Sequence, residues 1–241
     1  MKNIKITLSL EKTVSKDVSI MVDALRASTT ITIALDKYRT IIPAFSKEEA
    51  EKIAIKNDAV LAGERTGKKI NGFTLGNSPI AIKNYKTNKE VLVLTTSNGT
   101  RILKSMGSKV LIGALINSAS VAKAALNLAN SHIDVVMAGV RGKFAIEDYL
   151  VGGDIVNSII DVSQEYNFNN QKIDLEIDEY AKIAKDKSKD YENLKNSILN
   201  SKSANRLMDL GYKKDILFSI QKNISKNIGI YENNEIRKYL I

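Results

Sequence analysis

Short apolar runs alternate with segments of helical period through the first two thirds of the chain. The apolar runs, rich in β-branched residues, predict strands over residues 18–22, 40–45, 59–62, 91–94, 110–112 and 133–137. Apolar residues three or four positions apart predict helices over residues 27–38, 98–106, 119–129 and 144–160. Ser46, followed by Glu49, forms a capping box that predicts the start of a further helix. This alternation predicts an α/β fold in which a mostly parallel sheet is flanked by helices.

The last third of the chain has a different pattern. Residues 174–200 are charged and helical in period, and we expect no strand among them. A capped helix is expected over residues 203–210, closed by Gly211, and a final strand over residues 228–231. The pattern therefore predicts a helical C-terminal part.

No internal repeat, low-complexity tract or Pro-rich linker divides the chain. We therefore predict a single domain over residues 1–241, with a two-lobe division near residues 165–200 as the alternative. No apolar run approaches the roughly 18 residues that span a bilayer, and the Lys-punctuated residues 1–10 are unlike a signal peptide. We predict a soluble, cytoplasmic protein without a membrane partner, and leave open whether it forms a homodimer.

The amino-acid composition limits which side chains can act in catalysis or bind a metal ion. The chain has no Cys and a single His, His132. The lack of Cys excludes a disulfide framework, a thiolate metal site and a Cys nucleophile. His132 precedes a predicted strand, and we interpret it as a surface or strand-edge residue. General acid–base chemistry and the binding of a hard metal ion would therefore fall mainly to carboxylates.

The net charge of +9 raises the question of nucleic acid binding. Lys residues are spread along the chain and are densest over residues 182–226, with no Trp and no basic stripe between aromatic residues. We interpret them as a solvated surface and predict no nucleic acid partner. The positive charge would help to attract a small anionic substrate.

Polar residues cluster directly after four of the predicted strands. The four clusters are residues 23–30, 63–65, 95–101 and 139–148. Because the carboxyl ends of parallel strands share one edge of a sheet, we expect the clusters to converge on one pocket. A long loop with several Gly leads from the second cluster to Asn77, Ser78 and Pro79, and loops of this length are uncommon unless functional.

Each cluster also has an interpretation without a site. Helix caps and an Asn-Gly turn account for the hydroxyls and amides of the first and third clusters. The Glu-Arg pair of the second cluster would be a surface ion pair, and Glu147 with Asp148 would complement a helix dipole. Asp23 favours a site, because a carboxylate directly after an apolar strand is costly unless it is paired or metal-bound.

The distribution of Arg also favours a site. The chain has seven Arg against 29 Lys, yet Arg26, Arg65, Arg101 and Arg141 all fall in the four clusters. Arg is preferred where a planar group binds phosphate or carboxylate through two hydrogen bonds. Carboxylates that can bind a metal ion, together with guanidinium groups that can bind an oxyanion, are typical of a site for a phosphate ester. The third cluster lacks the Gly-Lys-Ser/Thr ending of a Walker loop, so ATP is not expected.

Five ordered motifs resemble those of the 2-phosphosulfolactate phosphatase family. They are Asp23-Ala-Leu-Arg-Ala-Ser-Thr-Thr, Gly63-Glu-Arg, Gly72-Phe-Thr-Leu-Gly-Asn-Ser-Pro79, Thr95-Thr-Ser-Asn-Gly-Thr-Arg101 and Phe144-Ala-Ile-Glu-Asp148. A weaker match is Ser203-Ala-Asn-Arg-Leu, followed by Leu210-Gly and Asp215. The resemblance runs from about residue 20 to about residue 220, which is nearly the whole chain.

The chain departs from the family pattern at a few positions. Ser28 and Ser97 stand where the family has Thr, which keeps the hydroxyl, and Val151-Gly-Gly replaces Cys-Ala-Gly. The resemblance implies an Mg²⁺-dependent phosphatase that converts 2-phospho-3-sulfolactate to 3-sulfolactate and phosphate in coenzyme M biosynthesis. A phosphatase acting on another small phospho-hydroxyacid and a non-catalytic anion-binding protein are the alternatives.

On this basis we assign roles to residues of the motifs. The expected metal ligands are Asp23, Glu64, Glu147 and Asp148, and the expected catalytic residues are Asp23, Arg26, Glu64 and Asp148. The expected substrate-binding residues are Arg65, Asn77, Ser78, Asn98, Gly99, Thr100, Arg101 and Arg141. Arg26 and Arg101 would hold the phosphate, and Arg65 or Arg141 would bind the sulfonate or carboxylate. We favour direct attack by water over an aspartyl-phosphate on Asp23, because Leu25 interrupts the Asp-x-Asp signature.

Overall fold

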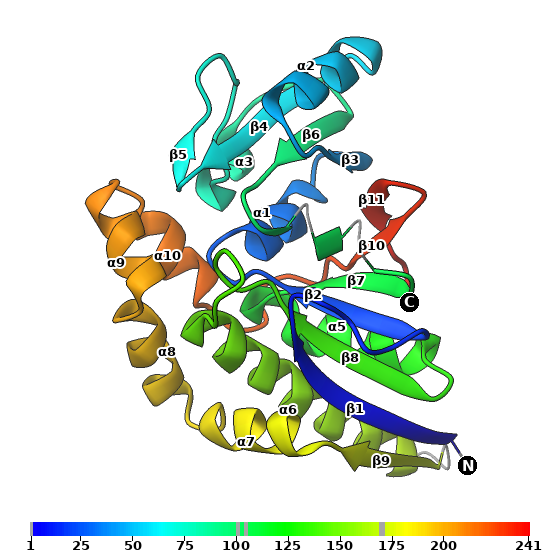
Figure 1. Cartoon of the computed structure of the whole chain (residues 1–241). Coiled ribbons are helices and arrows are strands. Elements are labelled where there is room, and N and C mark those ends of the chain that lie inside the picture. Colours follow the sequence, from blue (N-terminus) through cyan, green and yellow to red (C-terminus); the bar gives the residue numbers. More distant parts are fainter. Residues whose placement is uncertain (1, 100–101, 104–105, 169–171) are drawn as a thin grey trace.

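The computed structural model describes residues 2–99, 102–103, 106–168 and 172–241. Through the described part of the chain runs an eleven-stranded sheet in the order β5-β4-β6-β3-β11-β10-β7-β2-β8-β1-β9 (Figure 1). Its strands are β1 (Lys2–Leu10), β2 (Val18–Val22), β3 (Thr40–Pro43), β4 (Val60–Arg65), β5 (Lys68–Lys69), β6 (Val91–Thr95), β7 (Lys109–Gly113), β8 (His132–Met137), β9 (Ile173–Ile177), β10 (Gly229–Glu232) and β11 (Glu235–Lys238).

Two blocks of parallel strands make up most of this sheet. The smaller block contains β4, β6 and β3, and the larger contains β7, β2, β8, β1 and β9. The antiparallel hairpin β10–β11 lies between them and pairs with β7 on one side and with β3 on the other. The predicted α/β fold with a mostly parallel sheet is thus confirmed.

Helices cover the sheet and connect its strands. They are α1 (Ala27–Ala34), α2 (Lys47–Lys56), α3 (Pro79–Asn84), the 3₁₀ turn η1 (Leu115–Asn117), α5 (Ser118–Leu128), α6 (Ile146–Phe168), α7 (Glu179–Lys187), α8 (Tyr191–Leu199), α9 (Lys202–Asp209) and α10 (Lys213–Ser219). The helix expected over residues 98–106 includes positions outside the described ranges.

Neighbouring side chains of a strand point to opposite faces of the sheet and pack against different helices. In the larger block, Ile20 of β2 belongs to the apolar cluster formed with α5 and α6, whereas its neighbour Met21 belongs to the cluster around α1. In the smaller block, Val93 of β6 packs with α2, and the flanking Leu92 and Leu94 pack with α3. Strands β2 and β6 are therefore buried on both sides, as expected for parallel strands.

Local sequence signals set several element ends. The Ser46 side chain caps α2 by accepting a hydrogen bond from the Glu49 N–H, 3.1 Å away, and the Glu49 carboxylate accepts one from the Phe45 N–H. Helix α1 ends at Ala34, four residues before the predicted end. The following Lys37 N–H bonds to the Ala34 carbonyl, a tighter turn that closes the helix.

The expectation that residues 174–200 contain no strand was wrong. Strand β9 lies at the edge of the sheet and pairs in parallel with β1. Its charged Asp174 and Glu176 are exposed, whereas Leu175 and Ile177 pack partly against the core. An edge strand that is exposed on one face has too few apolar residues to stand out beside charged helices.

The C-terminal helices run along one side of the molecule. In Figure 1, helices α7 to α10 pass from β9 at the bottom to the level of β5 and α3. The predicted helical C-terminal part is therefore confirmed, and it passes over the edge where the strands of both blocks end. The division of the chain into domains stays a prediction.

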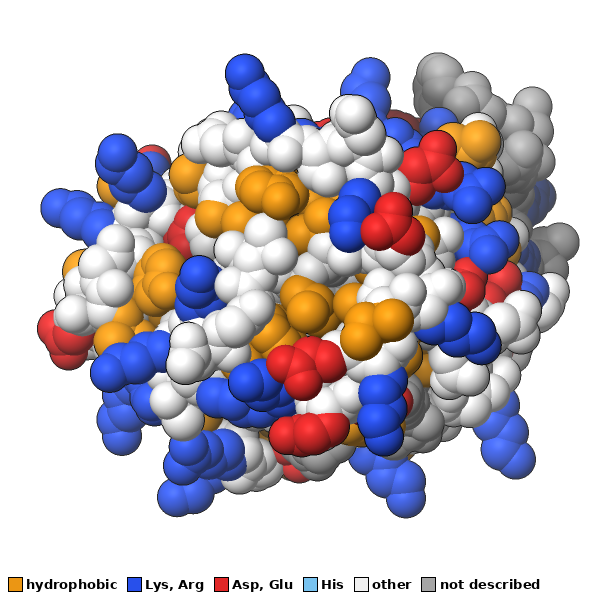
Figure 2. All heavy atoms as spheres, turned by 90° about the horizontal axis from the view of Figure 1, so that it is seen from above, with side chains coloured by type: hydrophobic (Ala, Val, Ile, Leu, Met, Phe, Trp, Pro, Cys, Tyr) orange, Lys and Arg blue, Asp and Glu red, His pale blue; other side chains and the backbone are white. Residues whose placement is uncertain are grey.

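The surface over α2 carries charges of both signs. Figure 2 shows Lys and Arg side chains dispersed among Asp, Glu and uncharged residues, without a continuous basic stripe on this face. Among the described residues, no helix is long and apolar enough to cross a membrane. The absence of a nucleic acid partner, the cytoplasmic location and the homodimer remain predictions.

Candidate active site

A cavity of about 100 Å³ lies at the carboxyl ends of β2, β4, β6 and β8, where the loops after these strands meet α9. It is lined by Asp23, Leu25, Arg26, Glu64, Thr66, Gly67, Asn77, Ser97, Asn98, Val140, Arg141, Ser203, Arg206 and Leu207. Each of the four polar clusters expected from the sequence contributes to this lining. This volume is below the roughly 300–1,000 Å³ of typical small-molecule pockets, so the cavity by itself has room for a small group and not for a polymer.

Asp23 follows β2 and is 8% exposed. Its Oδ1 accepts a hydrogen bond from the Ala27 N–H at 3.1 Å, so that Asp23 satisfies a free amide at the start of α1. Burial, followed by the negative charges of Glu64 and Glu147, raises the pKa of Asp23 to about 6, although the bond from Ala27 opposes this shift. The carboxylate thus caps a helix and also faces the cavity.

Asp148 lies beneath this site in the first turn of α6. Its two oxygens accept hydrogen bonds from the Ala24 N–H and the Gly139 N–H, both at 2.8 Å. Burial and the charges of Asp23 and Glu147 raise the pKa of Asp148 well above its usual range. Asp148 therefore fixes the loops after β2 and β8 to each other.

Both carboxylate oxygens of Glu64 also accept hydrogen bonds from backbone N–H groups. Its Oε1 accepts from the Ser97 N–H at 2.7 Å, and its Oε2 accepts from the Gly67 N–H at 2.6 Å. The neighbouring Gly63 lies so close to β6 that an added Cβ would be 2.6 Å from the Thr95 carbonyl oxygen. This close approach of the two strands places Glu64 next to the loop after β6.

Arg26 is buried and paired with a residue from the far end of the chain. Its Nη1 donates to Asp215 Oδ2 of α10 at 2.6 Å, and both side chains are almost fully buried. Its Nη2 donates to the Gly67 carbonyl at 3.1 Å, and the Tyr212 ring lies 4.1 Å from the guanidinium carbon. The charge of Arg26 is therefore already matched by Asp215.

Three of the expected substrate-binding residues do not line the cavity, and neither do the expected metal ligands Glu147 and Asp148. The Arg65 guanidinium donates to the carbonyls of Glu64 and Phe45 and to Thr95 Oγ1. The Ser78 hydroxyl donates to Asp215 Oδ1 at 2.7 Å and caps α3. Gly99 lies close to Asp23, since an added Cβ would be 3.4 Å from Asp23 Oδ2.

Three other expected residues line the cavity, and two lie outside the described part of the chain. Asn77 is 4% exposed, and its Oδ1 has no hydrogen-bond partner among the described residues. Asn98 Oδ1 accepts from the Arg141 N–H at 3.3 Å, which links the loops after β6 and β8. Thr100 and Arg101 fall outside the described residues.

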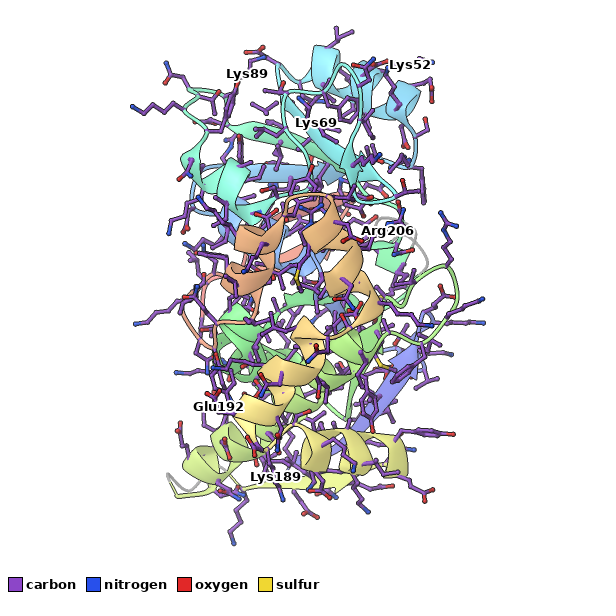
Figure 3. The ribbon with its side chains drawn as sticks, turned by 90° about the vertical axis from the view of Figure 1, so that its left-hand side faces the viewer. Lys52, Lys69, Lys89, Lys189, Glu192 and Arg206 are labelled. Carbon is purple, nitrogen blue, oxygen red and sulfur yellow. The ribbon has the colours of Figure 1, made fainter. Side chains whose placement is uncertain are left out.

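The sequence analysis matched Ser203-Ala-Asn-Arg-Leu and Asp215 weakly to the family motifs, but it assigned α9 and α10 no role in this site. Arg206 and Leu207 line the cavity, and Asp215 holds Arg26. Figure 3 shows Arg206 projecting from α9 toward the side where the loop after β8 lies. The preference for Arg over Lys at anion sites, applied to the last third of the chain, would have left two candidates, Arg206 and Arg237.

The described residues contain no ready-made group of three or more His, Asp or Glu side chains arranged to hold a metal ion. They do contain two buried carboxylates with free oxygens. The Glu147 carboxylate, 3% exposed, and Asp23 Oδ2 accept no hydrogen bond within the described part of the chain. A cation or a ligand bearing hydrogen-bond donors would satisfy these oxygens.

The chain is similar to known proteins over most of its length. A family model described as 2-phosphosulpholactate phosphatase matches residues 5–234. The chain is 44% identical over 232 residues to the 2-phosphosulfolactate phosphatase of Methanothermobacter thermautotrophicus, covering 96% of this chain and 94% of that protein. It is 36% identical over 228 residues to the enzyme of the same name from Methanocaldococcus jannaschii, covering 91% of each. A probable 2-phosphosulfolactate phosphatase from Clostridium acetobutylicum is 34% identical over 231 residues, or 94% of each chain.

Proposed function

Because this chain belongs to the 2-phosphosulfolactate phosphatase family, we propose that it hydrolyses 2-phospho-3-sulfolactate to 3-sulfolactate and phosphate with the help of Mg²⁺. The match across residues 5–234 is the observation that carries this proposal, and it confirms the resemblance predicted from the five motifs. In an organism that makes coenzyme M, the reaction would serve its biosynthesis. The activity is that of a phosphoric monoester hydrolase.

The free oxygens of Asp23 and Glu147 support a divalent cation. Mg²⁺ prefers oxygen ligands and usually takes only one or two protein carboxylates, together with water and substrate phosphate. The lack of a larger ligand cluster among the described residues is therefore compatible with Mg²⁺. Asp23 and Glu147 would hold the ion, while Glu64 and Asp148, fixed by backbone N–H groups, would support the site. When bound, Mg²⁺ supplies positive charge that stabilises the phosphoryl oxygens.

Arg26 and Asn98 are positioned to bind the phosphate. Of the five N–H donors of a guanidinium, Arg26 uses two for Asp215 and Gly67, which leaves donors for a ligand in the cavity. The Asn98 Oδ1 already accepts from Arg141, so its amide N–H₂ group can donate to a phosphate oxygen. Both side chains line the cavity beside the carboxylates.

Asn77 would orient the attacking water. Its buried Oδ1 has no partner among the described residues and belongs to the cavity lining, so a water molecule can donate a hydrogen bond to it. Phosphoryl transfer passes through a loose transition state, in which positioning and charge stabilisation contribute more than a strong nucleophile. This favours direct attack by water over a phosphorylated Asp23.

Phosphate release from a panel of phospho-hydroxyacids, measured with Mg²⁺ and with a chelator, tests the proposal. We expect Mg²⁺-dependent release from 2-phospho-3-sulfolactate and a loss of about 100-fold or more in Glu147→Gln. Glu165→Gln is the matched control, because Glu165 is an exposed carboxylate on the same helix. Release only from another phospho-hydroxyacid would change the substrate. Tight anion binding without any release would favour a non-catalytic anion-binding protein.

A further inference from the structure

Arg206, like Arg141, differs from Arg26 in having no ion-pair partner among the described residues of the cavity lining. Arg26 is paired with Asp215, and the Arg65 guanidinium is bound to backbone carbonyls away from the cavity. Among the described residues, Arg206 has no ion pair and its side chain is exposed, although it lines the cavity. The uncompensated positive charge of the described lining thus comes from Arg206 and from Arg141 across the cavity.

Arg206 also lies where the inner cavity joins a second space. A larger groove adjoins the cavity between the loop after β8 and the start of α9. Val140, Ser203 and Arg206 line both spaces, Asp23 and Glu64 line only the inner cavity, and Glu147 lines only the outer groove. A ligand whose phosphate reaches Asp23 and Glu64 in the inner cavity would therefore place its opposite end near Arg206.

Packing fixes α9, and with it Arg206, relative to the catalytic loops. Leu207, the next residue, is buried in a cluster with Ala204 and Ile216. At Gly67, an added Cβ would come within 2.9 Å of the Leu210 side chain, so α9 and the following turn lie directly on the turn that holds Glu64. A guanidinium on a packed helix can select a ligand group by position.

We propose that Arg206 is a specificity-determining residue, which binds the second anionic group of the substrate and leaves the phosphate to the inner cavity. This inference rests on the proposed function, because it takes the substrate to be a phosphate ester that carries a further sulfonate or carboxylate. A guanidinium suits such planar or tetrahedral oxyanions through paired hydrogen bonds. Phosphate esters without a second anionic group would not be bound more tightly because of Arg206.

Substrate pairs that differ in the second anion test this role. In Arg206→Gln, we expect the KM for 2-phospho-3-sulfolactate to rise about 10- to 100-fold with a much smaller change in kcat. The inhibition constant of the product 3-sulfolactate should rise by a similar factor. The constants for isopropyl phosphate, as substrate or inhibitor, and for inorganic phosphate should stay unchanged. Arg206→Lys should restore part of the loss, because it restores the charge without the planar fork.

Lys202→Gln is the matched control. Lys202 is exposed on the same helix, one turn before Arg206, and lines only the outer groove. It should change none of these constants. Equal losses on isopropyl phosphate and phosphosulfolactate, or no loss on either, would overturn the role of Arg206.

The wild-type enzyme separates this inference from the proposed function. If it hydrolyses a different phospho-hydroxyacid, the proposed substrate fails, but a selective loss in Arg206→Gln for esters with a second anion still supports the role of Arg206. If it hydrolyses phosphosulfolactate and Arg206→Gln is unaffected, only the inference fails. If it neither hydrolyses any ester nor binds 3-sulfolactate, both fail.

Discussion

Replacing Asp23 with Asn should stabilise the metal-free protein while removing its activity. Asp23 is buried beside Glu64 and Glu147, and its single hydrogen bond from a described residue, from the Ala27 N–H, can also be made to an amide oxygen. Asp23→Asn therefore removes a buried negative charge but keeps the cap on α1. Functional sites often hold such destabilising groups, and their removal trades activity for stability.

The magnitude follows from the pKa of Asp23. Folding raises this pKa from 3.8 to about 6, so the folded protein binds the proton more tightly than the unfolded chain does. Metal-free wild-type protein should thus lose stability as the pH rises from about 4 through 6, by about 3 kcal/mol in total. Asp23→Asn lacks this loss. Its free energy of unfolding should equal that of the wild type near pH 4 and exceed it by about 3 kcal/mol at pH 8.

Urea unfolding followed by circular dichroism in the presence of a chelator measures this difference. Free energies of unfolding are compared from pH 4 to pH 8 for the wild type, for Asp23→Asn and for Asp161→Asn, whose residue is exposed on α6. The control should follow the wild type. An Asp23→Asn variant that is no more stable than the wild type at pH 8, or whose advantage is independent of pH, would refute the reasoning.

Three further variants test the packing around the site. Asp215→Asn leaves the buried guanidinium of Arg26 without its counter-charge and should lower the free energy of unfolding by about 3–5 kcal/mol; a loss under 1 kcal/mol in urea titrations would contradict this. Gly153→Ala places a methyl group against the Ala184 carbonyl oxygen of α7, so α6 and α7 must separate, and a melting temperature equal to the wild type would argue against this contact. Ser46→Ala removes the cap of α2 and should cost about 1 kcal/mol in chemical unfolding, without changing phosphate release.

Buried strands and capped helices were predictable from the sequence because their signals are local. Strand β2 is buried at all five positions and reads as one apolar run, and its predicted bounds agree with the structure. Strand β1 was not assigned, because its Lys residues interrupt the apolar pattern on its partly exposed side. Strand β11 was not predicted either, because the charged Glu235 and Lys238 are more typical of a surface turn than of a strand.

The site was predictable only where a side chain follows its own strand. The sequence placed Asp23 and Glu64 at strand ends, and the structure brings both to one cavity. The partner of Arg26 could not be inferred, because Asp215 lies 189 positions away and nothing local links the two. The backbone contacts of Arg65 depend on the same kind of tertiary packing.

The hairpin β10–β11 has a consequence for how the chain matures during synthesis. It is translated after every other strand of the sheet, and β3 and β7 join one sheet only through it. Until residues 229–238 leave the ribosome, the block that carries Glu64 and the block that carries Asp23 have no shared sheet to hold them in register. A nascent chain can thus form both parallel blocks early, yet it gains a complete catalytic pocket only after the hairpin has been synthesised.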